Sequence, residues 1–197
     1  MKVPFGTVGV GDKVEDLFID DEALYSVTEQ AGANAMTDML RAYVPVGMTV
    51  MDGTACVGGN TYSAQQHFPT VAVEQDSLRC RILRSNMAVL GATNVTYIED
   101  DLVTMLEASA LPSGVPARLG AIVIDAPWGG LDYMKSKEVE LYMSERPLAK
   151  VVQLCTRWTG VVMLKVGAGW QMLTAWRCPD TCVADVGCVI GTKKLPH

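Results

Sequence analysis

The sequence has no apolar run long enough to cross a bilayer, and it contains only two histidines. Its longest apolar stretches, such as the one beginning at Val161, are short and interrupted, whereas a transmembrane helix needs about 20 apolar residues. Neither His67 nor His197 lies near a serine or cysteine motif, which disfavours a hydrolase with a histidine-activated nucleophile. The first residues lack the apolar core and cleavage site of an export signal. We therefore predict an intracellular protein, cytoplasmic or nuclear, with no membrane association.

The sequence also lacks an excess of basic residues and a regular spacing of cysteines. The net charge of the 197-residue chain is −6, whereas a protein that follows long nucleic acid usually carries a basic face. A pocket for a single nucleotide remains compatible with this charge. The six cysteines are scattered and lack the close pairs of a zinc site, so we predict reduced thiols and no metal. With 49% hydrophobic and 19% charged residues, the chain is expected to fold as one packed domain.

Short apolar runs alternate with helical patterns along the chain. The predicted strands cover residues 48–51, 71–74, 95–98, 121–124 and 161–166. The predicted helices cover residues 26–44, the segment from the glycine turn to residue 67, residues 76–90, a segment near residue 103, and residues 144–158. A capping box, Ser26 to Glu29, begins the first helix, and a strand pair turning at 185–187 is expected between residues 181 and 190. This pattern predicts a doubly wound α/β fold with a mostly parallel sheet, comprising an N-terminal extension (1–44) and a core (45–197).

Acidic residues follow four consecutive predicted strands, namely Asp52, Glu74, Asp101 and Asp125. Ligands of doubly wound sheets bind beyond the carboxyl ends of the strands, so these acids are expected at one binding edge. Gly58 and Gly59 are expected to let the backbone approach a ligand closely. The turn matches the dinucleotide fingerprint poorly, and Glu74 suits a ribose that carries no phosphate. A cationic nucleoside such as S-adenosylmethionine fits a pocket with several acids.

Four runs make a more specific resemblance: D-G-T-A-C-V-G-G-N (52–60), A-V-E-Q-D (72–76), I-E-D-D-L (98–102) and I-D-A-P-W-G-G-L-D-Y (124–133). Together with Y-S-V-T-E (25–29), they resemble the trimethylguanosine synthase family, whose members are class I methyltransferases that act on the exocyclic amine of 7-methylguanosine RNA caps. The similarity covers about residues 20–133. This chain differs from the family pattern at Cys56, which replaces a glycine, and at Ala126 and Leu131, which each replace a proline.

The resemblance implies a function and a set of site residues. The predicted cofactor is S-adenosylmethionine, bound by Thr28, Asp52, Thr54, Ala55, Asn60, Glu74, Asp101 and Asp125. Within that set, Glu74 would hold the ribose and Asp101 the adenine amine. The predicted catalytic residues are Asp125, Pro127 and Trp128. The predicted partner is capped RNA or a cap nucleotide, contacted by Ser26, Asn86, Trp128 and Lys135. Trp128 would stack on the methylated base, whose positive charge an indole face attracts.

Two other functions remain open from the sequence. An adenine amine methyltransferase also carries an acid, prolines and an aromatic residue after a strand, and D-A-P-W in isolation fits that pattern equally well. The flanking G-G-L-D-Y and the upstream S-V-T-E favour the cap. A catalytically silent protein that binds a cap or nucleoside is the second alternative, suggested by Cys56 and Ala126. The sequence predicts neither the oligomeric state nor the number of methyl groups added.

Overall fold

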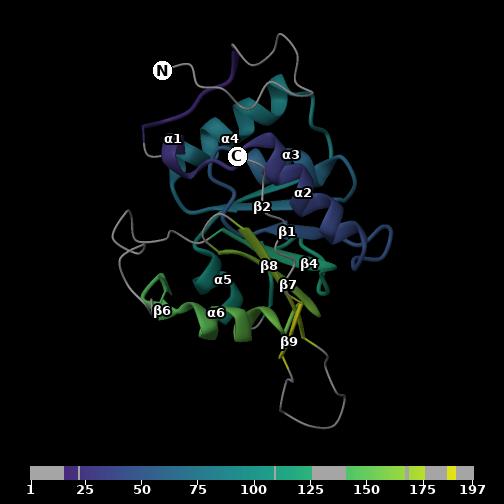
Figure 1. Ribbon diagram of the computed structural model, residues 1–197. Coiled ribbons are helices and arrows are strands. Elements are labelled where there is room, and N and C mark those ends of the chain that lie inside the picture. The colour runs from purple at the N-terminus through teal and green to yellow at the C-terminus, as the bar shows by residue number, and fades with distance from the viewer. Residues whose placement is uncertain are drawn as a thin grey trace.

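The structure of the protein is a computed structural model that describes residues 16–21, 23–108, 110–125, 141–166, 169–175 and 186–189 (Figure 1). The predicted catalytic residues Pro127 and Trp128 lie outside these ranges, as does the predicted substrate residue Lys135. Ser26 lies within them, at the end of a helix, but its side chain is not among those described.

Seven strands of the described chain form one sheet in the order β3-β2-β1-β4-β7-β8-β9. The strands are β1 (Val50–Asp52), β2 (Thr70–Glu74), β3 (Val95–Glu99), β4 (Ala121–Ile124), β7 (Val161–Val166), β8 (Gly169–Ala175) and β9 (Val186–Val189). The first five in spatial order, from β3 to β7, run parallel, whereas β8 and β9 pair antiparallel. The strand order reverses between β1 and β4, which is the switch point of a doubly wound sheet. The predicted fold class is therefore confirmed.

Helices cover both faces of this sheet (Figure 1). They are α1 (Ala23–Ser26), α2 (Gln30–Arg41), α3 (Gly59–Gln65), α4 (Ser77–Val89), α5 (Leu102–Glu107) and α6 (Leu148–Cys155). On one face, α2 and α3 pack against Val50 and Val123, and α4 packs nearby against Ala72. On the other face, α5 and α6 pack against Met51 and Ile122. Successive strand residues point to opposite faces. Because helices cover both faces, β1 and β4 are buried along their whole length, and β4 reads as an uninterrupted apolar run.

The prediction of one helix over residues 26–44 is wrong, because the structure has two helices with a break between them. Ser26 ends α1, and Glu29 is the residue before α2. No side-chain hydrogen bond caps α2, so the predicted capping box does not form. Instead, the Ala33 amide bonds to the Glu29 carbonyl, 2.9 Å away. The break at residues 27–29 leaves Thr28 available for a contact with the sheet edge.

The predicted helix over residues 144–158 differs from the structure at its start. The helix begins later, at Leu148. Before it lies a hairpin of β5 (Tyr142–Met143) and β6 (Arg146–Pro147). The turn residues Ser144 and Glu145 have positive φ angles of 45° and 63°, as two-residue hairpin turns require.

The predicted C-terminal strand pair exists, but with a different partner for its second strand. Val186–Val189 forms β9, and its partner is β8, with Gly187 opposite Thr174. Gly187 therefore lies within a strand, and the expected turn at residues 185–187 is wrong. The preceding segment, 176–185, lies outside the described residues.

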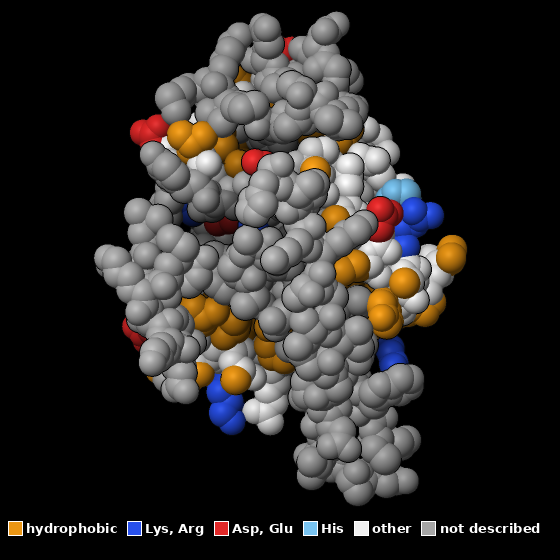
Figure 2. Space-filling view, in the orientation of Figure 1, with side chains coloured by type: hydrophobic (Ala, Val, Ile, Leu, Met, Phe, Trp, Pro, Cys, Tyr) orange, Lys and Arg blue, Asp and Glu red, His pale blue; other side chains and the backbone are white. Residues whose placement is uncertain are grey.

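On the face shown in Figure 2, the described basic side chains form no continuous patch. Among the described residues, no helix has both the length and the apolar character needed to cross a membrane. The same residues contain no cluster of three histidine, cysteine, aspartate or glutamate side chains suited to a metal ion.

Candidate active site

The carboxyl ends of four neighbouring strands converge at one edge of the sheet. Asp52 ends β1 and Glu74 ends β2. Asp125 directly follows β4, and Lys165 lies near the end of β7. Because β2, β1, β4 and β7 are consecutive in the sheet, their last residues come together beside the switch point. The three acids were predicted at this edge from the sequence, whereas Lys165 was not.

Asp52 lies beneath the turn that follows β1. Its side chain is 1% exposed and accepts a hydrogen bond from the Thr61 hydroxyl at 2.6 Å and a longer one from the Thr54 amide at 3.4 Å. Burial raises the pKa of Asp52 to about 6, against the lowering effect of these two bonds. Nearby charges on Asp125 and Glu74 raise the pKa further. Asp52 thus joins the turn to α3 from below, and its predicted contact with the donor stays a prediction.

The turn itself is held against the sheet by backbone hydrogen bonds. The Gly53 amide donates to the Val123 carbonyl, and the Ala55 amide donates to the Val73 carbonyl, both at 2.9 Å. The turn is thereby tied to β4 on one side and to β2 on the other. Its hydroxyl residue, Thr54, accepts a bond from the Asp125 amide at 2.8 Å. The turn after β1 and the end of β4 are thus directly connected.

The glycines of the turn are explained by packing within the chain. Gly58 has a φ of 106°, and a β-carbon there would lie 2.6 Å from Met87 Cε. At Gly59 a β-carbon would lie 2.8 Å from the Thr28 carbonyl oxygen. These glycines therefore admit α4 and the N-terminal extension. Gly59 also lines a small cavity beside the turn, and the predicted close approach of a ligand stays a prediction. Cys56, where the family pattern has glycine, does adopt a positive φ, 49°.

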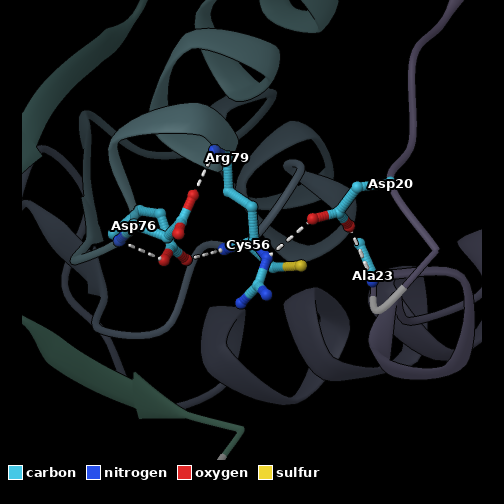
Figure 3. A network of polar contacts seen from close by, with 6 residues as sticks. Asp20, Ala23, Cys56, Asp76 and Arg79 are labelled. Carbon is cyan, nitrogen blue, oxygen red and sulfur yellow. Dashed lines mark hydrogen bonds and ion pairs between the residues drawn. The ribbon is translucent and has the colours of Figure 1, made fainter.

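Glu74 is the centre of a polar network at the end of β2, and Figure 3 shows Cys56, Asp76 and Arg79 of this network. Glu74 is 7% exposed and accepts hydrogen bonds from the backbone amides of Cys56, at 2.8 Å, and Asp76, at 2.9 Å. The Asp76 carboxylate in turn caps α4 by accepting from the Arg79 amide at 2.9 Å. This backbone bond lowers the pKa of Asp76. Glu74 therefore fixes both the turn after β1 and the start of α4.

The same network reaches the N-terminal extension. Arg79 Nε donates to Asp20 Oδ2 at 3.1 Å, and the Asp20 carboxylate accepts from the Ala23 amide at 2.7 Å, at the start of α1 (Figure 3). A second attachment involves Asn86 on α4, which is fully buried. Its amide group exchanges two bonds with the backbone of Phe18, each 2.9 Å long, and donates to the Val57 carbonyl at 3.0 Å. Asn86 thus anchors the extension, and its predicted contact with a guanine stays a prediction.

Asp101 follows β3 and begins α5. Its carboxylate accepts from the Thr104 amide at 2.8 Å, from the Thr104 hydroxyl at 2.9 Å, and from the Ser144 hydroxyl. Burial acts to raise the pKa of Asp101, but these hydrogen bonds together outweigh it and hold the pKa below its usual range. Asp101 is therefore placed at the predicted edge as a helix cap, and its contact with an adenine amine stays a prediction.

Asp125 is the centre of a second polar network, at the end of β4. Thr28 Oγ1 donates to Asp125 Oδ2 at 3.0 Å, and Lys165 Nζ donates to the same oxygen at 2.9 Å. Lys165 also donates to Thr28 Oγ1 at 3.2 Å. The three side chains form a closed triangle that joins the extension, β4 and β7. The Asp125 side chain is 11% exposed.

Lys165 is the functional candidate that sequence reasoning missed. It occupies the fifth position of the apolar strand V-V-M-L-K-V, where a parallel strand covered on both faces usually carries an apolar residue. A charged residue in such a run, close to the carboxyl end of a strand beside the switch point, was the available signal. The acids were predicted because they follow consecutive strands, whereas Lys165 is a single cation in one strand.

A small cavity lies between the two networks. Its lining includes five of the predicted donor residues, Thr28, Thr54, Ala55, Asn60 and Asp125. Asn60 is 6% exposed, and its side-chain oxygen has no hydrogen-bond partner among the described residues. A buried acceptor without a donor is costly unless a ligand or water satisfies it. The lining thus offers an amine-bearing cation one carboxylate, Asp125, and one unsatisfied acceptor, Asn60 Oδ1, which fits the amino acid part of S-adenosylmethionine.

Comparisons with known proteins agree with this geometry. A family model described as RNA cap guanine-N2 methyltransferase matches residues 47–166, which is more than half of the chain. The chain belongs to this family. It is also 22% identical, over 121 residues, to the trimethylguanosine synthase of Schizosaccharomyces pombe. That match covers 60% of this chain and 49% of the S. pombe protein, so the chain spans about half of its relative's length. The family resemblance predicted from the sequence is therefore confirmed.

Solved structures are similar at the level of the fold. The precorrin 8W decarboxylase of Methanobacterium thermoautotrophicum superposes with a TM-score of 0.54 at 14% identity, covering 78% of this chain and 72% of that protein. A protein of Streptococcus mutans solved in complex with SAH superposes with a TM-score of 0.50 at 10% identity, covering 79% of this chain and 93% of that protein. At such identities the fold is shared, and function has to be argued from the site.

Proposed function

We propose that this protein transfers a methyl group from S-adenosylmethionine to the exocyclic amine of a 7-methylguanosine cap, on capped RNA or on a cap nucleotide. Family membership supports the reaction class. The observation that carries the proposal is the position of Asp125, which lines the small cavity beside the donor residues and also ends β4 at the switch point. The methyl donor and the acceptor amine would thus both lie next to the Asp125 carboxylate.

The residues of the first turn suit the donor. Bound S-adenosylmethionine supplies a methyl group on a cationic sulfur. Glu74 keeps both carboxylate oxygens at the edge, where each accepts one backbone amide and retains a further lone pair for a ribose hydroxyl. Asn60 offers its unpartnered oxygen to an amino group. The Streptococcus mutans neighbour with SAH shows that a protein of this fold can hold a ligand of this class.

The acceptor half suits a conjugated amine. The lone pair of a guanine amine is delocalised into the ring, so the amine is a weak nucleophile until its hydrogens are held by acceptors. Among the described residues, Asp125 Oδ1 accepts no hydrogen bond, because Thr28 and Lys165 both bond to Oδ2. Oδ1 can therefore accept an amine hydrogen and turn the nitrogen toward the methyl group. The same carboxylate stabilises the positive charge that grows on the nitrogen as the bond forms.

Two predicted acceptor contacts lie outside the described residues and support the proposal only through the sequence. Trp128 would stack on the cationic 7-methylated base, an interaction worth up to about 2 kcal/mol when it excludes water. Lys135 would pair with the cap phosphates. Pro127 would restrict the backbone next to Trp128. All three residues follow Asp125 in the chain within ten residues, so they are close in sequence to the acceptor carboxylate.

An acceptor panel tests the proposal. The purified chain is incubated with S-adenosylmethionine and, separately, with 7-methyl-GDP, with GDP and with an adenine-containing oligonucleotide, and the products are weighed by mass spectrometry. We expect methylation of 7-methyl-GDP and little of GDP. Methylation of the oligonucleotide alone would establish the adenine enzyme instead. Binding of S-adenosylhomocysteine with no methylation of any acceptor would leave a silent binding protein.

The variant Trp128→Ala tests the stacking. Affinity for 7-methyl-GDP should fall by as much as about thirtyfold, because up to about 2 kcal/mol of stacking is lost. Affinity for S-adenosylhomocysteine, measured by calorimetry, should stay unchanged. A variant that methylates 7-methyl-GDP at the parent rate would show that the indole does not stack on the base.

A further inference from the structure

We propose that Lys165 is a positioning residue for methyl transfer: it holds the Asp125 carboxylate by Oδ2, so that Oδ1 faces the acceptor amine, and it keeps Thr28 docked across the site. The inference rests on the proposed function, because it assigns Asp125 to the acceptor. It adds a residue that the sequence motifs do not contain, contributed by β7, beyond the runs that resemble the family.

The position of Lys165 is unfavourable for an ammonium group unless charged or polar partners replace its water. The two residues before it on β7, Met163 and Leu164, are buried, and β7 lies inside the sheet between β4 and β8. The Lys165 side chain is 21% exposed. Removing most of the water around an ammonium group is unfavourable unless a charged or polar partner replaces that water. Asp125 and Thr28 are such partners, at 2.9 Å and 3.2 Å.

Two donors on one oxygen fix the direction of the other oxygen. The terminal torsion of an aspartate side chain is broad, so an unheld carboxylate rotates readily. Here Lys165 Nζ and Thr28 Oγ1 both donate to Asp125 Oδ2. They come from segments 40 and 97 residues away in the sequence. Held from both sides, Asp125 has one orientation, which is the alignment that an in-line displacement demands.

The ammonium also balances the charge of this edge. Asp125 is surrounded by Lys165 from β7, Asp52 from β1 and Glu74 from β2, and the charges of Asp125 and Glu74 both act on Asp52. Arg79 of α4 lies on the donor side, where its charge acts on Cys56. Without Lys165, the acceptor end would keep its carboxylates and lose its bonded cation, and Asp125 Oδ2 would lose one of its two donors.

The test compares Lys165→Met with Lys165→Arg, using Lys150→Met as a matched control at an exposed lysine of α6. For Lys165→Met we expect kcat to fall about tenfold to a hundredfold, because alignment is lost, while the KM for S-adenosylmethionine stays within about twofold of that of the parent. Lys165→Arg restores most of the rate, because a guanidinium also bonds a carboxylate. Lys150→Met behaves as the parent does.

The split between kcat and KM separates positioning from mere packing. A packing defect would disturb the donor and acceptor sites together, whereas lost alignment lowers kcat and leaves the KM for S-adenosylmethionine near that of the parent. Parent kcat in Lys165→Met would overturn the proposal, as would an equal loss of rate in Lys165→Arg and Lys165→Met.

A thermal double-mutant cycle covers the case in which the cap is not the acceptor. Melting temperatures are compared for Lys165→Met, Asp125→Asn and the double variant, with no acceptor present. We expect the shift of the double variant to be clearly different from the sum of the single shifts, because the two side chains interact directly. Additive shifts would contradict the ion pair itself. If the cycle shows coupling and 7-methyl-GDP is not methylated, the proposed function fails, and the kinetic comparison is repeated on whichever acceptor the panel identifies. With no acceptor found at all, a positioning role in methyl transfer is also overturned.

Discussion

The donor side and the acceptor side of the active-site edge hold their carboxylates in different ways. On the donor side, Glu74 accepts backbone amides from Cys56 and Asp76, which lie within 18 residues of it in the sequence. On the acceptor side, Asp125 is held by the side chains of Thr28 and Lys165, which come from distant segments. Hydrogen bonds from backbone amides are set by the fold, whereas a hydrogen bond from a side chain is lost when that one residue is substituted. Under the proposed function, the half that holds the donor would therefore depend mainly on the fold, and the half that holds the acceptor would depend on side chains particular to this chain.

The comparison predicts its largest effect at Asp125. Asp125→Asn should lower kcat about 100-fold to 1000-fold, the usual loss when a group that stabilises transition-state charge is removed. Donor affinity, measured by titration with S-adenosylhomocysteine, should change little. As a control, Glu107→Gln alters an exposed acid that pairs with Arg146 and should leave both quantities unchanged. A tenfold loss of donor affinity in Asp125→Asn would show that the two halves are not separable.

A second prediction concerns Asp52, whose pKa is raised from 3.8 to about 6 by burial. A carboxyl with a raised folded-state pKa stabilises the fold below its unfolded pKa, and that stability is lost as pH rises through about 6. Asp52→Asn removes this dependence. Its free energy of unfolding relative to the parent should therefore rise by about 3 kcal/mol between pH 4 and pH 7, since two pKa units correspond to roughly that energy.

Urea unfolding of both proteins at several pH values measures this difference. Asp76→Asn serves as a contrast, because its helix-capping bond lowers the pKa of Asp76. Its stability relative to the parent should change with pH in the opposite direction. Parallel pH curves for the parent and Asp52→Asn would mean that Asp52 is solvated in the folded protein.

On the donor side, Glu74→Gln should weaken S-adenosylhomocysteine binding about tenfold, because the glutamine NH₂ group faces one of the two backbone amides that the carboxylate accepted. In saturating donor, kcat should stay close to that of the parent. The matched control is Glu99→Gln, an exposed acid directly opposite Glu74 on the neighbouring strand. If Glu74→Gln lowers kcat and leaves donor binding unchanged, the division between donor and acceptor halves is wrong.

The smallest effect is expected at Cys56, which holds a left-handed φ of 49°. Cys56→Gly should be more stable than Cys56→Ala by about 1 kcal/mol, because only glycine adopts this conformation without strain from a β-carbon. Both variants lose the thiol, so the comparison isolates the backbone. Thermal unfolding at one pH is sufficient. Equal melting temperatures would mean that the turn relaxes around the alanine.

The sequence predicted the parts of the molecule that depend on local pattern. The parallel strands, the acids at their ends and the family were correct because each is written in a run of a few residues, such as A-I-V-I-D. The single helix over residues 26–44 was wrong, and the packing role of the turn glycines was not predicted, because both have tertiary causes. Thr28 leaves the helical pattern for Asp125, and Gly59 accommodates the Thr28 carbonyl. Lys165 is visible in the sequence as a lone cation in an apolar strand, but its role could not be assigned from local pattern, since its partners lie in two other segments.

The central claim is that the Asp125 edge directs the amine of a 7-methylated guanine toward a donor methyl group. The most direct measurement incubates the parent chain with 7-methyl-GDP and methyl-labelled S-adenosylmethionine and then determines, by fragmentation in the mass spectrometer, which atom carries the label. We predict label on the exocyclic amine of the base in the parent and none in Asp125→Asn. Label elsewhere on the nucleotide, or equal labelling by the variant, would contradict the claim.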